Sequence, residues 1–168
     1  MKIAIIYTTS NKSTKKSCEI LSGKLNSDVK LISIENAKTS CLLKYNFIIL
    51  VASALEGKVQ NNLKLFISRN KKNLKEKPIA LAVNCEQNID IRGRLNKAFT
   101  EEMVESSYAN SNFGYELDPD EGNFLQKRKI NNKIKEYKKD GKSLPTLNIN
   151  EIDKFADIIN KMIEKRVD

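Results

Sequence analysis

Apolar runs and amphipathic stretches alternate from the start of the chain. Residues 2–7 form a short apolar run that predicts a strand, and residues 13–26 then carry apolar side chains at helical spacing on one face. Residues 28–34 alternate as a strand does. The run NFIILVAS, residues 46–53, is apolar at odd and even positions alike, which is typical of a strand buried on both faces of a parallel sheet. The centre of a sheet is therefore expected here.

The alternation continues through the second half of the chain. Residues 59–74 predict a helix, and PIALAVN, residues 78–84, predicts another strand buried on both sides. Residues 95–103 predict a further helix, and NFGYELD, residues 112–118, a last strand. Apolar residues at helical spacing over residues 152–162 predict a closing amphipathic helix.

Strands and helices of these lengths predict an α/β fold, an open parallel sheet covered by helices on both faces and joined by right-handed crossovers. With five strands, a flavodoxin-like three-layer sandwich with the strand order 2-1-3-4-5 is the leading candidate. We expect one domain over residues 1–168. In such sheets a ligand binds beyond the carboxyl ends of the strands, where the strand order reverses. The loops after the first, third and fourth strands are therefore expected on one rim.

Composition limits the class of protein. The 168 residues, 40% of them hydrophobic, have the length of one globular domain. The longest apolar run, residues 47–55, is far below the roughly 20 residues that span a bilayer, so we expect a cytoplasmic protein. The three cysteines, Cys18, Cys41 and Cys85, lack metal-ligand spacing and favour reduced thiols over disulfides.

The chain has no histidine, which removes several chemistries. A Ser-His or Cys-His nucleophile pair, an imidazole general base and a His-ligated metal are all excluded. If the protein is an enzyme, a cofactor that carries its own reactivity is the economical solution.

Four motifs in register resemble those of a known family. The stretch YTTSNKSTKK follows the first strand, and VASALEGKVQNNLKLFI, VNCEQN and GYELDPDEGNF follow in order. Together they resemble the short flavodoxin-like proteins related to bacterial quinone-dependent protoporphyrinogen oxidase. The resemblance covers nearly the whole chain. It implies a flavodoxin-like fold, FMN as cofactor, and oxidoreductase activity.

The loop after the first strand is the candidate phosphate site. Backbone N–H groups at a helix N-terminus, helped by the helix dipole and by hydroxyl groups, can bind the phosphate of FMN. A G-x-G-x-x-G fingerprint and a Walker A loop are both missing, which disfavours a dinucleotide or a nucleoside triphosphate. Alternatively, Ser13 only caps the first helix. The candidate residues are Thr8, Thr9, Ser10, Asn11, Lys12, Ser13 and Thr14.

Lys12 stands where the resembled family usually has glycine. A glycine there would permit a positive φ or a close approach to the ligand. Lys12 could instead contribute an ammonium group to the phosphate, and the preceding Asn11 could adopt the left-handed conformation.

The other two loops are expected beside the flavin ring. In the second loop Leu55 is the best candidate to face the ring, with ordinary loop packing as the alternative. In the third, a carboxylate at Glu86 would oppose an anionic reduced flavin, although a solvated acid is the simpler interpretation. Neither loop contains an aromatic residue, so we expect at least one face of the ring to be accessible. The candidate residues are Ser53, Ala54, Leu55, Glu56 and Gly57 in the second loop and Asn84, Cys85, Glu86 and Gln87 in the third.

The net charge of +9 points to acidic partners. Basic residues crowd the segment 127–139 beside apolar ones, a composition compatible with a helix on anionic lipid at the inner face of the membrane, or with a solvated basic helix. An acidic redox protein is another candidate partner, and a homodimer stays open. Nucleic-acid binding has less support, because aromatic residues do not interleave with the basic run.

Two functions remain from different classes. In the first, the protein is an FMN-dependent oxidoreductase that moves electrons from a reduced organic substrate to a quinone or a protein acceptor. In the second, the altered phosphate loop has lost flavin, and the domain is a binding or regulatory module that keeps the fold.

Overall fold

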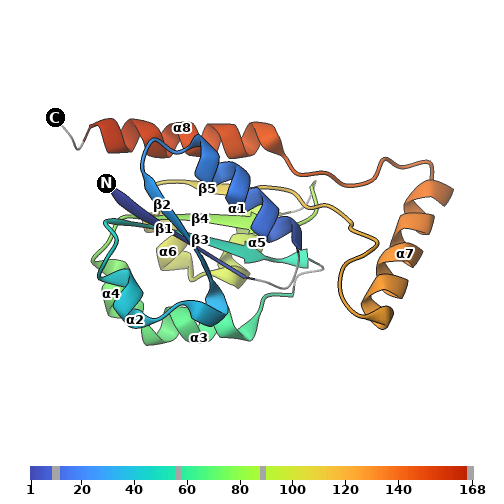
Figure 1. The fold of residues 1–168 in the computed structure, drawn as a ribbon, viewed down its shortest axis with the longest axis horizontal. Coiled ribbons are helices and arrows are strands. Elements are labelled where there is room, and N and C mark those ends of the chain that lie inside the picture. The colour runs from blue at the N-terminus through green and yellow to red at the C-terminus, as the bar shows by residue number, and fades with distance from the viewer. Residues whose placement is uncertain (9–11, 56–57, 88–89, 166–168) are drawn as a thin grey trace.

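Five parallel strands form the single sheet of the described structure, which is a computed structural model covering residues 1–8, 12–55, 58–87 and 90–165. The strand order is β2-β1-β3-β4-β5, so the predicted flavodoxin-like topology is confirmed. Figure 1 shows the strands running toward one edge of the molecule, where their carboxyl ends lie. The strands are β1 (Lys2–Tyr7), β2 (Asp28–Ser33), β3 (Phe47–Ser53), β4 (Ile79–Asn84) and β5 (Asn110–Asn112).

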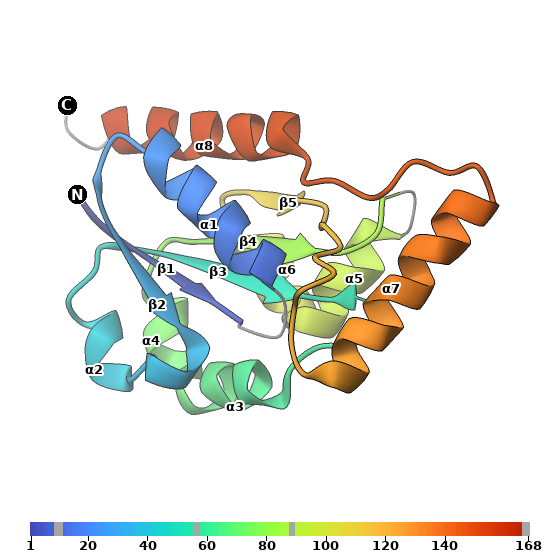
Figure 2. The ribbon, with the colours of Figure 1, turned by 45° about the vertical axis from the view of Figure 1, so that its right-hand side comes forward.

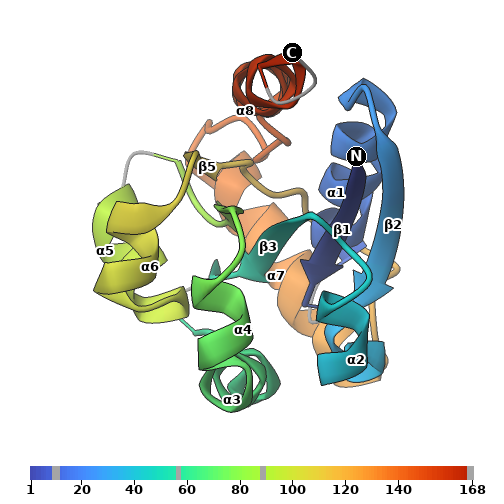
Figure 3. The same cartoon turned by 90° about the vertical axis from the view of Figure 1, so that its left-hand side faces the viewer.

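Helices cover both faces of the sheet, which gives the predicted three layers (Figure 3). One face carries α1 (Lys12–Lys24) and α8 (Ile149–Glu164). The opposite face packs against α3 (Asn61–Arg69), α4 (Lys71–Lys75), α5 (Ile91–Ala98) and α6 (Glu101–Ser106), with the short η1 (Ile34–Asn36) and α2 (Thr39–Leu42) beside them. The helix α7 (Phe124–Lys139) lies on neither face.

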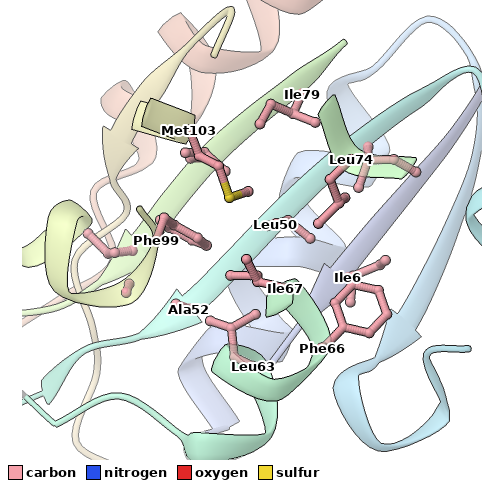
Figure 4. Packing of buried hydrophobic residues seen from close by; sticks show 14 of the residues in the cluster. Ile6, Leu50, Ala52, Leu63, Phe66, Ile67, Leu74, Ile79, Phe99 and Met103 are labelled. Carbon is pink, nitrogen blue, oxygen red and sulfur yellow. The ribbon is translucent and has the colours of Figure 1, made fainter. Parts of the chain in front are cut away.

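The apolar character of the central strands explains their position. Every residue of β3 is buried, as every residue of β4 is, because each strand has a neighbour on both sides and helices above and below. Alternate residues of the strands feed two separate cores. Figure 4 shows one of them, in which Leu50 and Ala52 of β3 lie beneath Leu63 and Ile67 of α3.

Two predicted helices are divided in the structure. The helix predicted over residues 59–74 is broken at Asn70, whose side-chain amide donates to the Phe66 carbonyl at 2.8 Å and ends α3. The helix predicted over residues 95–103 is two helices, because Thr100 caps the start of α6 by accepting from the Met103 amide. In both places a polar side chain satisfies helix-end groups, which periodicity alone does not detect.

The last strand is also displaced from its prediction. β5 ends at Asn112, and only Gly114 continues with an isolated antiparallel bridge to Leu147. Gly114 has a φ of +67°, which turns the chain out of the parallel ladder. The expected strand over residues 112–118 is therefore wrong beyond its first residue.

The two helices of the C-terminal region differ in how they are held. α8 buries six residues against α1 and the sheet, whereas α7 buries none and stands beyond the carboxyl edge of the strands (Figure 2). No helix within the described ranges is both long enough and apolar enough to cross a membrane.

Candidate functional site

The carboxyl ends of β1, β3 and β4 bring the three predicted loops together. Tyr7 pairs with Val51, and Ser53 pairs with Asn84, so the strands end side by side. The buried Thr8 hydroxyl accepts a hydrogen bond from the Ser53 amide at 2.7 Å. This bond fixes the start of the first loop against the start of the second.

Asn84 connects the third loop to its neighbours. Its fully buried side chain donates to the Gly114 carbonyl at 2.8 Å and accepts from the Ser17 hydroxyl at 3.1 Å. Its backbone carbonyl accepts from the Ala54 amide at 3.0 Å. Asn84, a polar residue at the end of an apolar strand, thus holds Gly114, Ser17 of α1 and Ala54 of the second loop in position.

The first turn of α1 carries two buried hydroxyl side chains. Ser13 and Thr14 are buried, and the Thr14 hydroxyl has no hydrogen-bond partner among the described residues. A buried hydroxyl without a partner costs free energy, so its retention points to a group that it could bind. The backbone N–H groups of this turn and the dipole of the helix add to the attraction for negative charge.

A carboxylate of the chain itself lies at this helix end. Glu121 accepts a hydrogen bond from the Lys12 backbone amide, and Asp118 pairs with the Lys12 ammonium group at 2.8 Å. One turn further on, Lys16 pairs with Glu116 at 2.7 Å. We call residues 116–121 the acidic segment.

The electrostatics of these groups differ with their exposure. The hydrogen bond to Lys12 lowers the pKa of Asp118, and the same bond raises the pKa of Lys12. Burial raises the pKa of Glu121, and the Lys12 amide and ammonium oppose that rise in part. The Glu121 carboxylate is therefore held at a place where its charge is only partly compensated.

Beside the acidic segment is a cavity of about 460 Å³. It is of the size of small-ligand sites, which occupy roughly 300–1,000 Å³. Ser53 and Leu55 of the second loop line it, as predicted, and Glu121 and α7 close its other side. Its apolar walls are Leu55, Val59, Tyr115, Leu117 and Ile130, and its basic residues are Lys58, Lys129 and Lys133.

Sequence reasoning missed Tyr115, Glu121 and the face of α7 that lines the cavity. Tyr115 is 1% exposed, its hydroxyl lies 3.3 Å from the Tyr137 hydroxyl of α7, and the Lys133 ammonium lies 5.7 Å from its ring centroid. The predicted strand over residues 112–118 concealed this turn. The run of acidic residues after Tyr115 was the available signal, since it complements Lys12 and Lys16.

The remaining predicted residues fall in three groups. Ala54 and Cys85 are fully buried, and burial raises the pKa of the Cys85 thiol to about 12, so this thiol is an inert packed group at neutral pH. The Glu86 carbonyl accepts from the Asn112 side chain, and Gln87 is exposed next to it. Thr9, Ser10, Asn11, Glu56 and Gly57 lie outside the described residues.

A larger cavity of about 890 Å³ lies at the amino end of β4, between the helices α3 to α6. Lysines from several elements surround it over an apolar floor that includes Leu74, Ile79 and Phe99. None of the described residues of the three predicted loops lines it.

Comparison with known proteins identifies the class. A model of the flavodoxin domain matches residues 4–143, and the chain belongs to this family. No curated protein matches the chain. The relation to protoporphyrinogen oxidase stays a prediction.

Solved structures with the same fold are flavodoxins of low sequence identity. A short-chain flavodoxin associated with a non-canonical PDU bacterial microcompartment is 13% identical, with a TM-score of 0.59 over 96% of this chain and 98% of that one. Oxidised flavodoxin 2 from Bacillus cereus is 18% identical, with a TM-score of 0.53 over 83% and 99%. The two-electron reduced flavodoxin of Megasphaera elsdenii is 12% identical, with a TM-score of 0.51 over 66% and 84%.

Proposed function

We propose that the protein is an FMN-binding flavodoxin that transfers electrons. The observation that carries this proposal is the first turn of α1, where a buried hydroxyl without a described partner lies beside backbone N–H groups and one of these already binds a carboxylate. FMN is the cofactor typical of the family, and related flavodoxins are known in oxidised and two-electron reduced forms.

The residues present fit the two ends of FMN. The Lys12 amide and the Thr14 hydroxyl would hold the phosphate, and the 460 Å³ cavity beside Leu55 and Tyr115 has apolar walls suited to the ring. Bound flavin would supply the chemistry, accepting a hydride equivalent and passing electrons on. The protein would supply position and electrostatics.

The finer function we propose is oxidoreductase activity with a quinone or a protein as acceptor, in the cytoplasm or at the inner face of the membrane. The basic helix α7 favours the hypothesis of an acidic partner. It stands at the edge of the candidate site and exposes Phe124 and Leu125 beside its cationic residues. A porphyrinogen is one candidate substrate, on the resemblance alone.

A flavin-free binding module is the second candidate. The observation that favours it is the acidic segment, which supplies the chain's own carboxylate to the helix end where phosphate would bind. Such a module would keep the fold and use the basic surface.

Absorbance after FMN loading separates the two. We expect the purified protein, incubated with excess FMN and desalted, to retain oxidised-flavin bands at about one FMN per chain. A colourless protein without measurable FMN affinity would contradict the proposal and favour the module.

The variant Thr14→Val tests the phosphate position. Loss of a hydrogen bond to a charged group should weaken FMN binding by roughly 1.5–3 kcal/mol. The free energy of unfolding without FMN should stay level or rise, because the variant removes a buried hydroxyl without a described partner. Reduced stability with unchanged FMN affinity would make Thr14 a purely structural residue.

A further inference from the structure

If the protein binds FMN as proposed, a contact at the start of α1 would regulate that binding. At the N-terminus of α1 the Glu121 carboxylate accepts the Lys12 amide hydrogen bond. A carboxylate and a phosphate present the same kind of anionic oxygen to such an N–H group, so only one of them can use it at a time. The chain therefore places its own carboxylate where the phosphate of a ligand would bind.

The acidic segment is matched to α1 over more than one turn. Lys12 and Lys16 are four residues apart and lie on one face of the helix, and they pair with Asp118 and Glu116. Asp120 is nearby and adds to the charge that favours the protonated Lys12. The segment is thus aligned along the helix by charge, and it brings Glu121 to the helix end.

These contacts are also weak enough to be exchanged. In both ion pairs the lysine side chain is more than half exposed and its acidic partner more than a third, and exposed pairs contribute little to stability. Glu121 itself is partly desolvated without a full counter-charge. A phosphate with close to two negative charges would be a stronger acceptor at the same N–H group.

We propose that the acidic segment competes within the chain for the phosphate position: Glu121 occupies the Lys12 amide in the ligand-free protein and must leave when a phosphate-bearing ligand binds. The competition lowers the apparent affinity by the fraction of molecules in which the position is free. The competition is for the Lys12 amide, which only a ligand with a phosphate would use, so it should affect FMN more than riboflavin.

Displacement of Glu121 also reaches α7. Only Gly122, with a φ of +82°, and the cap residue Asn123 separate Glu121 from the first residue of this helix. α7 contributes Gln126, Lys129 and Lys133 to the wall of the cavity. Phosphate binding is therefore coupled to the position of the basic helix, and the ligand changes the surface that a partner meets.

Calorimetric titration of the full chain with FMN and with riboflavin tests the competition. Glu121→Gln keeps the shape and removes the charge, and it should tighten FMN binding on the order of tenfold and riboflavin binding by a much smaller factor. Asp118→Asn should give a smaller gain in the same direction. The matched control is Glu76→Gln, an exposed residue at the end of α4 on the opposite edge of the sheet, which should change neither affinity.

The outcomes separate this inference from the proposed function. Equal FMN affinity in the natural protein and in Glu121→Gln overturns the competition and leaves FMN binding intact. If neither the natural protein nor Glu121→Gln binds FMN, the proposed function fails. The competition is then tested by following the Lys12 amide resonance by NMR while inorganic phosphate is added. If the Lys12 resonance reaches its final position at a lower phosphate concentration in Glu121→Gln, the competition is supported. Identical titrations of the two proteins overturn it.

Discussion

Gly114 determines how the chain leaves the sheet after β5, at the carboxyl edge of the strands. Its carbonyl accepts from Asn84, its amide donates to the Asn112 side chain at 3.0 Å, and its φ of +67° directs the chain away from the sheet. A Cβ at this position would lie 2.6 Å from the Thr146 carbonyl oxygen. Both the conformation and the space therefore require glycine.

We predict that Gly114→Ala destabilises the protein by about 2 kcal/mol or more, since the positive φ alone costs an L-residue about 1–2 kcal/mol. Gly23→Ala is the matched control, because Gly23 is inside α1 and an added Cβ would meet nothing within 4 Å beyond its chain neighbours and the backbone of its own helix. That change should stabilise by about 0.5–1 kcal/mol. Urea denaturation measures both, and equal effects would contradict the assigned role of Gly114.

Thr14 and Glu121 show what residue-level reasoning from the sequence can reach. Thr14 was named because hydroxyls in a strand-to-helix loop are local and visible in the sequence. Glu121 was not, since its contact with Lys12 joins residues 109 positions apart. No periodic pattern in the sequence indicates that a distant loop will fold back onto the end of a helix.

Helices α7 and α8 have equal length but differ in how firmly they pack against the rest of the protein. Each has 16 residues and an asparagine cap, but only α8 has a buried face. The sequence predicted α8 from its amphipathic spacing, and it could predict α7 only as a basic segment because no core selects one face of that helix. Local opening of α7 should therefore need less free energy than that of α8.

The two caps provide a matched pair of variants. Asn123→Ala should weaken α7 by about 1 kcal/mol and speed amide exchange in its first turn about fivefold, with the melting temperature unchanged. Asn148→Ala should lower the free energy of global unfolding by a similar amount, because α8 belongs to the core. A fall in melting temperature for Asn123→Ala would place α7 in the cooperative unit instead.

At the scale of the whole molecule, the sheet was the most predictable part and the site the least. β3 and β4 are uniformly apolar, so their burial on both faces and the strand order followed from pattern and connection rules. One domain over residues 1–168 stays a prediction, supported by the packing of α8 onto α1 and the sheet. The site is assembled from segments that only this topology brings together.

The net charge of +9 gives a prediction for the whole protein. We expect it to co-sediment with vesicles containing phosphatidylserine at low salt and to be released as salt screens the attraction. Lys138→Glu with Lys139→Glu on α7 should weaken this binding more than Lys71→Glu with Lys72→Glu on α4, although both pairs change the total charge equally. Equal losses would mean that the total charge, rather than α7, governs association, and binding to neutral vesicles would exclude an electrostatic cause.

The bridge between Gly114 and Leu147 closes the intervening part of the chain into one large loop. The chain leaves the sheet and returns at one point, where the Asn148 amide donates to the Phe113 carbonyl at 2.8 Å. Because the two ends already meet, an excised or exchanged segment leaves only a short gap to close, and loop length adds little to the entropy of closure. We expect changes in the length or sequence of α7, which buries no residue, to leave the architecture of the sheet intact.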